Sequence, residues 1–222
     1  PELEDIMEIS LNVQRDTNEI IKRRQQKADQ LQKEKDRQNL IARELAAART
    51  LRDRNVQLYR MYQFDRAYVA LKKLHAATKT DPARKMLEMM ISRCERLRNL
   101  KDFIIERLSE QPFRWGWKQT GSRRDVLGAN QKSIKIKGEE VPWGEVSYKQ
   151  MISIIEHCFV GSDKTKKEIG RLRLAVAVLC QEDERELEAR KYGDMALEVA
   201  PELRKEHKLL FDRFRALRNK YK

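Results

Sequence analysis

Glycine and proline are distributed very unevenly along this chain of 222 residues. From residue 3 to about residue 60 the sequence contains neither, whereas residues 111–146 hold five of the eight glycines and two of the five prolines. Both residues disfavour helix interiors, so their distribution predicts a long N-terminal helix and a non-helical segment near the middle of the chain.

The N-terminal helix carries apolar residues over only part of its length. Isoleucine and valine recur at helical spacing over residues 6–20, but among residues 22–39 only Ala28 and Leu31 are apolar. The same stretch holds seven basic and three acidic residues. A helix without an apolar face has little to bury. We therefore expect residues 1–50 to form an arm that bridges solvent, pairs weakly as a coiled coil, or frays.

Residues 51–110 are predicted to form a helical hairpin region. The apolar pattern returns at Leu51 and Leu58, and a short turn over residues 62–67 leads into a second helix. Asp81-Pro82 then marks a break, because proline disfavours helix at the residue before it. A third helix is expected to continue from there toward residue 103.

Residues 111–146 alternate apolar and basic side chains, which is typical of strands with one buried face. Gly138 is predicted to lie at the tip of a hairpin, and Pro142, which lacks an N–H donor, at an edge or end of the sheet. We expect a small antiparallel sheet of two or three strands. Such a sheet needs a packing surface against the helices, for which the candidates are Trp115, Trp117 and Trp143.

Residues 147–222 are predicted to form a run of helices joined by short loops. Ser147 with Gln150, and Thr165 with Glu168, have the spacing of capping boxes, so a helix is expected to begin after each serine or threonine. Helices follow over about 165–180 and 184–199, with a last one toward Leu217. Short loops make such helices antiparallel neighbours.

Within this region the chain resembles a tetratricopeptide repeat. The small residues at the helix crossing would be Ala177, Ala189 and Ala196, with Leu197 and Pro201 completing the pattern. Arg173 and Gly193 depart from it, because the family usually has aromatic residues there. A second, weaker copy spans residues 51–74, with Ala67 at the crossing.

The resemblance implies a protein that binds partners through a helical surface and performs no chemistry. Two copies separated by a sheet would not make a regular superhelix. The layout of helices, sheet and terminal repeat-like pair is similar to that of bacterial proteins whose roles are poorly characterised.

The sequence contains no pattern that predicts catalysis or a cofactor. It has no nucleophile elbow, no phosphate-binding glycine loop, and no histidine pair at helical spacing for a metal. His157 adjoins Cys158, but neighbours on a helix point about 100° apart, so we interpret the pair as structural. The three cysteines, Cys94, Cys158 and Cys180, are predicted to be buried free thiols. We expect no catalytic residue, no metal and no cofactor.

The chain is strongly basic, with 48 Lys and Arg against 35 Asp and Glu, a net charge of +13. Nucleic acid, acidic proteins and anionic membrane surfaces are all compatible with that charge. One segment, between Phe113 and Gly138, has a local balance of +6. Its candidate contacts to an anionic partner are Arg114, Lys118, Arg123, Arg124, Lys132, Lys135 and Lys137. The same residues are also explained as a solvated sheet face that protects an edge strand.

The longest apolar run, Leu174–Cys180, is far shorter than the roughly 20 residues of a membrane span. The chain begins with Pro1, so we expect a processed product or a piece of a longer protein. We therefore predict a mostly helical α+β protein: repeat-like hairpins flanking a small antiparallel sheet, with a long N-terminal helix. Its expected function is non-enzymatic protein binding or scaffolding. The alternatives are nucleic-acid binding through residues 114–137, and assembly, including homo-oligomerisation, through the N-terminal helix.

Overall fold

The computed structural model describes the backbone of residues 2–119 and 122–213 and the side chains of residues 18–114 and 124–212. Within these residues the chain forms seven α-helices and one four-stranded antiparallel sheet, so the predicted class, mostly helical α+β with a long N-terminal helix, is confirmed. The α-helices are α1 Glu2–Arg60, α2 Phe64–Ala77, α3 Asp81–Glu110, α4 Tyr148–Phe159, α5 Lys166–Glu182, α6 Glu186–Val199 and α7 Arg204–Lys208. The strands are β1 Phe113–Gln119, β2 Ser122–Ala129, β3 Ser133–Ile136 and β4 Glu139–Pro142.

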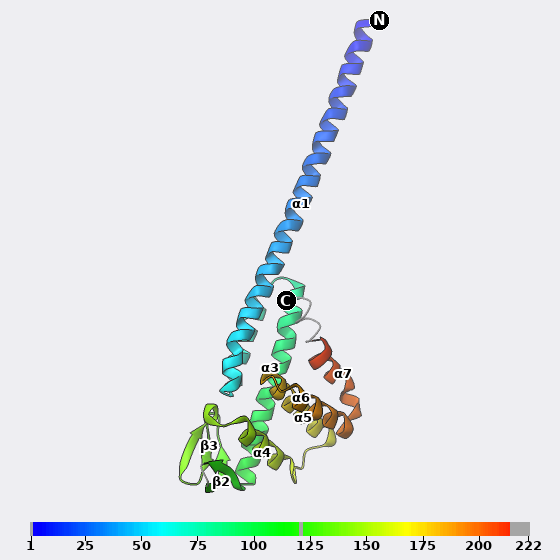
Figure 1. Cartoon of the computed structure of the whole chain (residues 1–222). Coiled ribbons are helices and arrows are strands. Elements are labelled where there is room, and N and C mark those ends of the chain that lie inside the picture. Colours follow the sequence, from blue (N-terminus) through cyan, green and yellow to red (C-terminus); the bar gives the residue numbers. More distant parts are fainter. Residues whose placement is uncertain (1, 120–121, 214–222) are drawn as a thin grey trace.

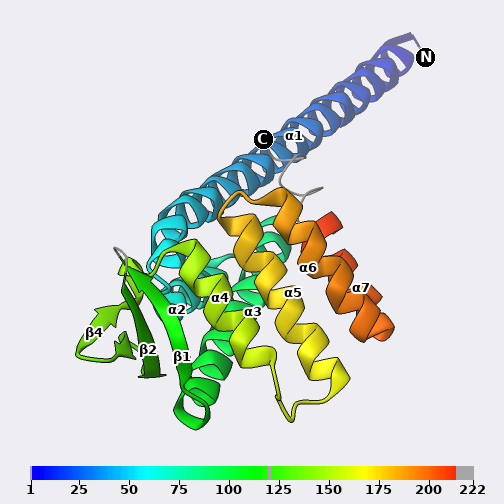
Figure 2. The ribbon, with the colours of Figure 1, turned by 60° about the horizontal axis from the view of Figure 1, so that its bottom comes forward.

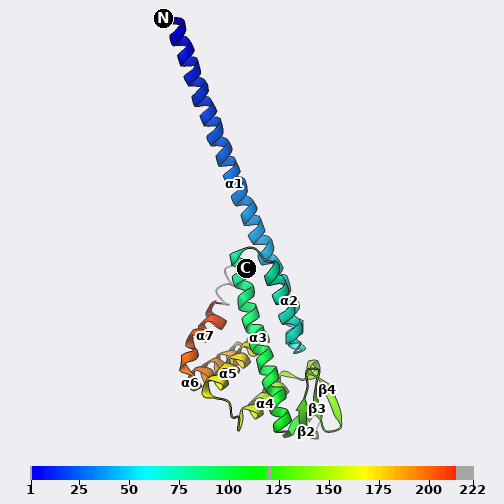
Figure 3. The ribbon, with the colours of Figure 1, turned by 180° about the vertical axis from the view of Figure 1, so that it is seen from behind.

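Helix α1 is a single element that projects far beyond the body of the molecule (Figure 1). It runs to Arg60, as the lack of glycine and proline up to about residue 60 predicts, so residues 51–60, assigned to the hairpin region, belong to the same helix as residues 2–50. The chain then reverses at residues 61–63, where Tyr62 has a φ of 52°. Helix α2 therefore returns alongside the body end of α1 (Figure 3).

Helix α3 lies at the centre of the body. It contacts α1, α2, α4, α5 and β2 (Figures 1 and 3). Buried residues recur along it at intervals of three and four, which places them on a broad stripe that meets neighbours on several sides. Pro82 lies in its first turn, where the missing N–H costs no hydrogen bond. The break predicted at Asp81-Pro82 is thus the start of α3.

The sheet has four strands in the order β1-β2-β3-β4, so the expectation of two or three strands was wrong. A two-residue turn, Lys137-Gly138, joins β3 to β4, and Gly138 has a φ of 97°, which favours glycine. Strand β4 is an edge strand and Pro142 is its last residue, as predicted. The single-sequence pattern missed a strand because Arg124 and Asp125 interrupt the alternation in β2.

The sheet is attached to the helices through its buried face and the 3₁₀ turn that follows it, η1 (Trp143–Glu145). Val126, Ile134 and Ile136 are buried, and β2 packs on α3. The indole Nε1 of Trp143 donates to the carbonyl of Asn130 at 2.7 Å, which fixes a side chain that is only 2% exposed. The side chains of Trp115 and Trp117 lie outside the described residues.

The C-terminal helices begin where the sequence predicts. Both capping boxes are present, with Ser147 and Thr165 accepting from the N–H groups of Gln150 and Glu168. Helices α4, α5 and α6 lie side by side across α3 (Figure 2). A 3₁₀ turn, η2 (Pro201–Leu203), leads into α7 and a π-helical turn, η3 (Leu209–Arg213). Leu217, toward which the last helix was predicted to run, is outside the described part of the chain.

Candidate functional site

The most exposed element of the molecule is the N-terminal half of α1. Every residue from Asn18 to Leu40 is exposed, a continuous run of 23 residues that would extend about 35 Å at 1.5 Å per residue. Packing against the body begins only at Ile41, which is half-buried, and Leu45, which is buried. Residues 18–40 are here called the arm.

The body end of α1, from which the arm extends, is anchored by Glu44. The Glu44 carboxylate accepts hydrogen bonds from the N–H groups of Lys79 and Thr80, both at 2.9 Å, and from the Thr80 hydroxyl at 2.6 Å. These groups lie just before α3, so Glu44 joins α1 to the start of α3. Burial raises the pKa of Glu44, but the three hydrogen bonds outweigh it and hold the pKa below its usual value.

Part of the charge on the arm is paired within the helix. Arg23 lies 2.7 Å from Glu19, and Arg37 lies 4.0 Å from Glu34, in pairs spaced four and three residues apart. Exposed pairs of this kind stabilise a helix by about 0.3–0.5 kcal/mol each. They support local helix formation without supplying the buried apolar contacts that usually hold a helix in place.

The residues assigned to the repeat pattern lie in the antiparallel hairpin of α5 and α6. Ala177, Ala189 and Ala196 are buried, Leu197 is half-buried, and Pro201 is exposed as the first residue of η2. Ala67, in the weaker copy, is also buried in α2. The two groups lie in separate helix pairs with α3 between them, so they do not form one site.

Sequence reasoning missed Gly170, where α5 lies close to the chain just after α6. A Cβ atom at Gly170 would lie 2.7 Å from Leu203 Cδ1 and 2.8 Å from Ala200 Cβ. These distances are shorter than van der Waals contact, so only glycine fits without a shift. A glycine inside a capped helical pattern was the available signal.

Two basic residues of the sheet lie next to carboxylates that the local charge balance leaves out. Arg124 pairs with Glu139 at 2.9 Å, and Lys135 is the cross-strand neighbour of Glu140. The +6 balance of residues 113–138 therefore omits two carboxylates that β4 brings back beside the lysines and arginines. Arg114, Lys132, Lys135 and Lys137 are exposed. The side chains of Lys118 and Arg123 lie outside the described residues.

A groove of about 520 Å³ lies where the sheet meets the turn between α1 and α2. Lys101 of α3 lies at its base, 6% exposed, and donates to the carbonyls of Tyr62 at 3.0 Å and Gln131 at 2.8 Å. Its ammonium is 5.1 Å from the centre of the Trp143 ring. Burial lowers the pKa of Lys101, against the opposite effect of Asp65 and Asp102. The Lys101 ammonium thus links α3 to the turn after α1 and to the turn between β2 and β3. These hydrogen bonds account for the burial of a charged group.

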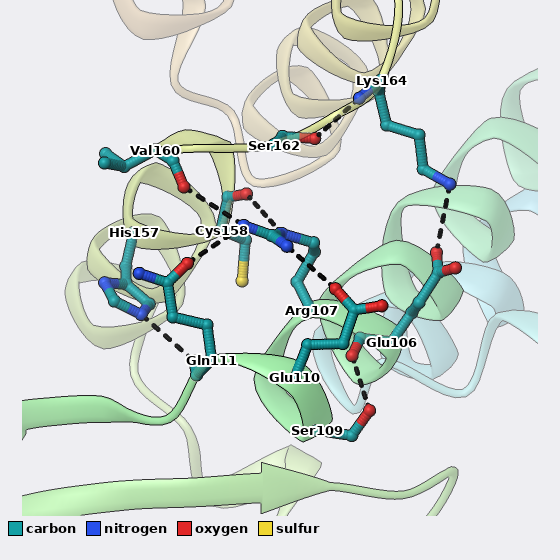
Figure 4. Close-up of polar contacts among 10 residues, drawn as sticks. All are labelled: Glu106, Arg107, Ser109, Glu110, Gln111, His157, Cys158, Val160, Ser162 and Lys164. Carbon is teal, nitrogen blue, oxygen red and sulfur yellow. Dashed lines mark hydrogen bonds and ion pairs between the residues drawn. The ribbon is translucent and has the colours of Figure 1, made fainter.

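His157 and Cys158, which are adjacent in α4, belong to a polar cluster at the end of α3 that includes Arg107 (Figure 4). Arg107 donates to the carbonyls of Cys158 and Val160 at 3.3 and 3.2 Å, and so caps the C-terminus of α4. The His157 ring stacks on Phe113 with centroids 4.2 Å apart. Burial raises the pKa of the Cys158 thiol to about 12, although Arg107 lowers it, so the thiol stays protonated near neutral pH.

Among the described residues no group of three or more His, Cys, Asp or Glu could hold a metal ion. No helix in the described part of the chain is both long and apolar enough to cross a membrane. Comparison of the chain with protein-family models, curated proteins and solved structures finds no match.

Proposed function

We propose that this chain is a non-enzymatic protein-interaction module in which the body holds the arm and the arm binds a partner protein. The observation that carries the proposal is the continuous exposure of residues 18–40 on a helix of 59 residues. Propensity alone seldom stabilises a helix that packs against nothing. A partner that packs on the arm would supply the missing contacts.

The body has the features of a support for such an arm. Arg93 of α3, only 2% exposed, donates to Glu182 of α5 at 2.6 Å and to the carbonyl of Leu210 at 2.8 Å. Together with Glu44 and Lys101, Arg93 forms hydrogen bonds that connect α3 and its start to elements distant in sequence. We infer that the α5–α6 hairpin, whose sequence resembles a tetratricopeptide repeat, offers a second protein-binding surface.

The proposal is tested by site-specific photo-cross-linking in cells of the source organism. A benzophenone amino acid replaces Leu31 on the arm in the full chain, and Val69, equally exposed on the body, serves as the matched control position. We expect Leu31, but not Val69, to form a covalent adduct with a discrete protein. Adducts with nucleic acid alone, or equal yields at both positions, would contradict protein binding through the arm.

A further inference from the structure

One side of the arm carries a stripe of side chains spaced four, three, four and four residues apart: Ile20, Arg24, Lys27, Leu31 and Lys35. At about 100° per residue these five positions fall within an arc of about 80° and span about 22 Å. All five are exposed, Ile20 at 52% and Leu31 at 64% (Figure 1 shows the free arm). This set is here called the stripe.

The three cations of the stripe differ from the other cations of the arm. Arg24, Lys27 and Lys35 form no ion pair with any side chain that the structure describes, and none has an acidic residue three or four positions away. Every other cation of the arm has an acidic residue three or four positions away, and Arg23 and Arg37 form ion pairs with theirs, Glu19 and Glu34. Positive charge without local compensation is thus concentrated on the stripe.

The side chains of the stripe favour one kind of binding partner. Two aliphatic side chains, with two cations between them and a third beyond Leu31, complement a helix that presents carboxylates around aliphatic residues. Nucleic acid would use the cations but not Ile20 and Leu31, and the arm has no aromatic side chain on which a base could stack. A second copy would place like charges against each other, which destabilises the pairing.

We propose that the stripe binds an acidic amphipathic helix of a partner protein. This inference rests on the proposed function, because it specifies the chemistry of the partner that the arm contacts. Binding is expected to weaken with salt, since exposed charges are screened, but to retain a component from Ile20 and Leu31 that salt does not remove.

The test uses the full 222-residue chain and a fluorescent synthetic peptide, helical and monomeric, with leucine along one side and glutamate beside it. Fluorescence anisotropy gives its affinity for the wild type and for two triple variants. One is Arg24→Gln, Lys27→Gln and Lys35→Gln on the stripe. The other is Lys22→Gln, Lys33→Gln and Arg37→Gln on the opposite side, which removes the same charge from the same segment.

We expect the stripe variant to bind the peptide about tenfold more weakly, and the control variant to stay within about twofold of the wild type. An Ile20→Ser, Leu31→Ser variant should also bind more weakly, at low and at raised salt alike. Circular dichroism confirms that each variant keeps the helix content of the wild type. Equal losses in both triple variants, or no binding by the wild type, would overturn the inference.

Three further measurements would show that something other than an acidic helix binds the stripe. Equal affinity for a scrambled peptide of the same composition, or tighter binding of single-stranded RNA, overturns the proposal. So does self-association of the wild type in sedimentation that the stripe variant abolishes, because the occupant is then a second copy. If Leu31 cross-links to a protein while the stripe variant binds the peptide normally, the proposed function stands and this inference fails.

Discussion

Replacing Gly170 by alanine tests how closely α5 approaches the end of α6. A methyl group there would meet Ala200 Cβ at 2.8 Å, Leu203 Cδ1 at 2.7 Å and the Ala196 carbonyl oxygen at 3.3 Å. The Ala200 methyl is attached directly to the backbone, so it cannot rotate away, and Leu203 is 1% exposed. The steric overlap can therefore be relieved only if α5 moves away from the end of α6 and the turn that follows it.

Two effects of opposite sign decide the result. Alanine is favoured over glycine inside a helix by about 0.8–1 kcal/mol. Overpacking a tight core contact costs about 1–3 kcal/mol. Contacts with Ala200 and Leu203 are both under 3.0 Å, so we expect the upper half of that range. The net prediction is a loss of about 1–2 kcal/mol from the free energy of unfolding.

Thermal and urea unfolding of the purified chain measure this loss. For a domain of this size 1 kcal/mol corresponds to a shift of about 2–4 °C in Tm. Gly193→Ala is the matched control, because its new methyl group would meet the far end of the His207 side chain, at 2.9 Å from Nε2, which can move. Helix propensity favours that variant by about 0.8–1 kcal/mol and the contact with a movable side chain offsets part of this gain, so its stability should equal that of the wild type or exceed it by up to about 1 kcal/mol.

The reasoning is refuted if Gly170→Ala is as stable as the wild type or more so, since helix propensity would then outweigh any contact. It is also refuted if both variants lose the same amount. A double variant supplies a further check. Ala200→Gly removes one of the two close atoms, so part of the loss caused by Gly170→Ala should be recovered, with a coupling of about 0.5–1.5 kcal/mol.

Three more predictions concern the repeat-like crossing, the arm and its anchor. Ala196→Leu should destabilise the chain by about 1–3 kcal/mol, because Ala196 is fully buried in the α5–α6 hairpin; an unchanged Tm would contradict this. Limited trypsin digestion should cut first between Lys22 and Arg37, since this stretch is exposed throughout, whereas strong amide-exchange protection there in a demonstrated monomer would oppose the prediction. Glu44→Gln should reduce stability at neutral pH by about 1 kcal/mol through weaker hydrogen bonds to Thr80 and Lys79. Because the folded-state pKa of Glu44 is lowered, its contribution is present above about pH 4.3 and is lost as the pH falls through the folded value, so the two urea midpoints should converge in acid; a constant difference would refute it.

The sequence by itself determined the elements whose signals are local. The capping boxes at Ser147 and Thr165, the turn at Gly138 and the edge position of Pro142 each depend on residues within four positions of one another. Hydrogen bonds of that range form in the same way wherever the segment lies, so a single sequence is enough to predict them. The polar composition of residues 22–39 likewise predicted a helix segment with little to bury, and every residue of it is exposed among the residues that the structure describes.

Only the tertiary structure decided which distant residues meet. Arg124 finds Glu139 across the sheet, Lys101 joins Tyr62 to Gln131, and Gly170 touches the end of α6. These contacts depend on how close-packed elements fit together, and many arrangements share the same apolar pattern. The stripe was determined partly by the sequence and partly by the tertiary structure. Its spacing is written in the sequence, but only the fold shows that none of its three cations forms an ion pair with a described side chain of the body.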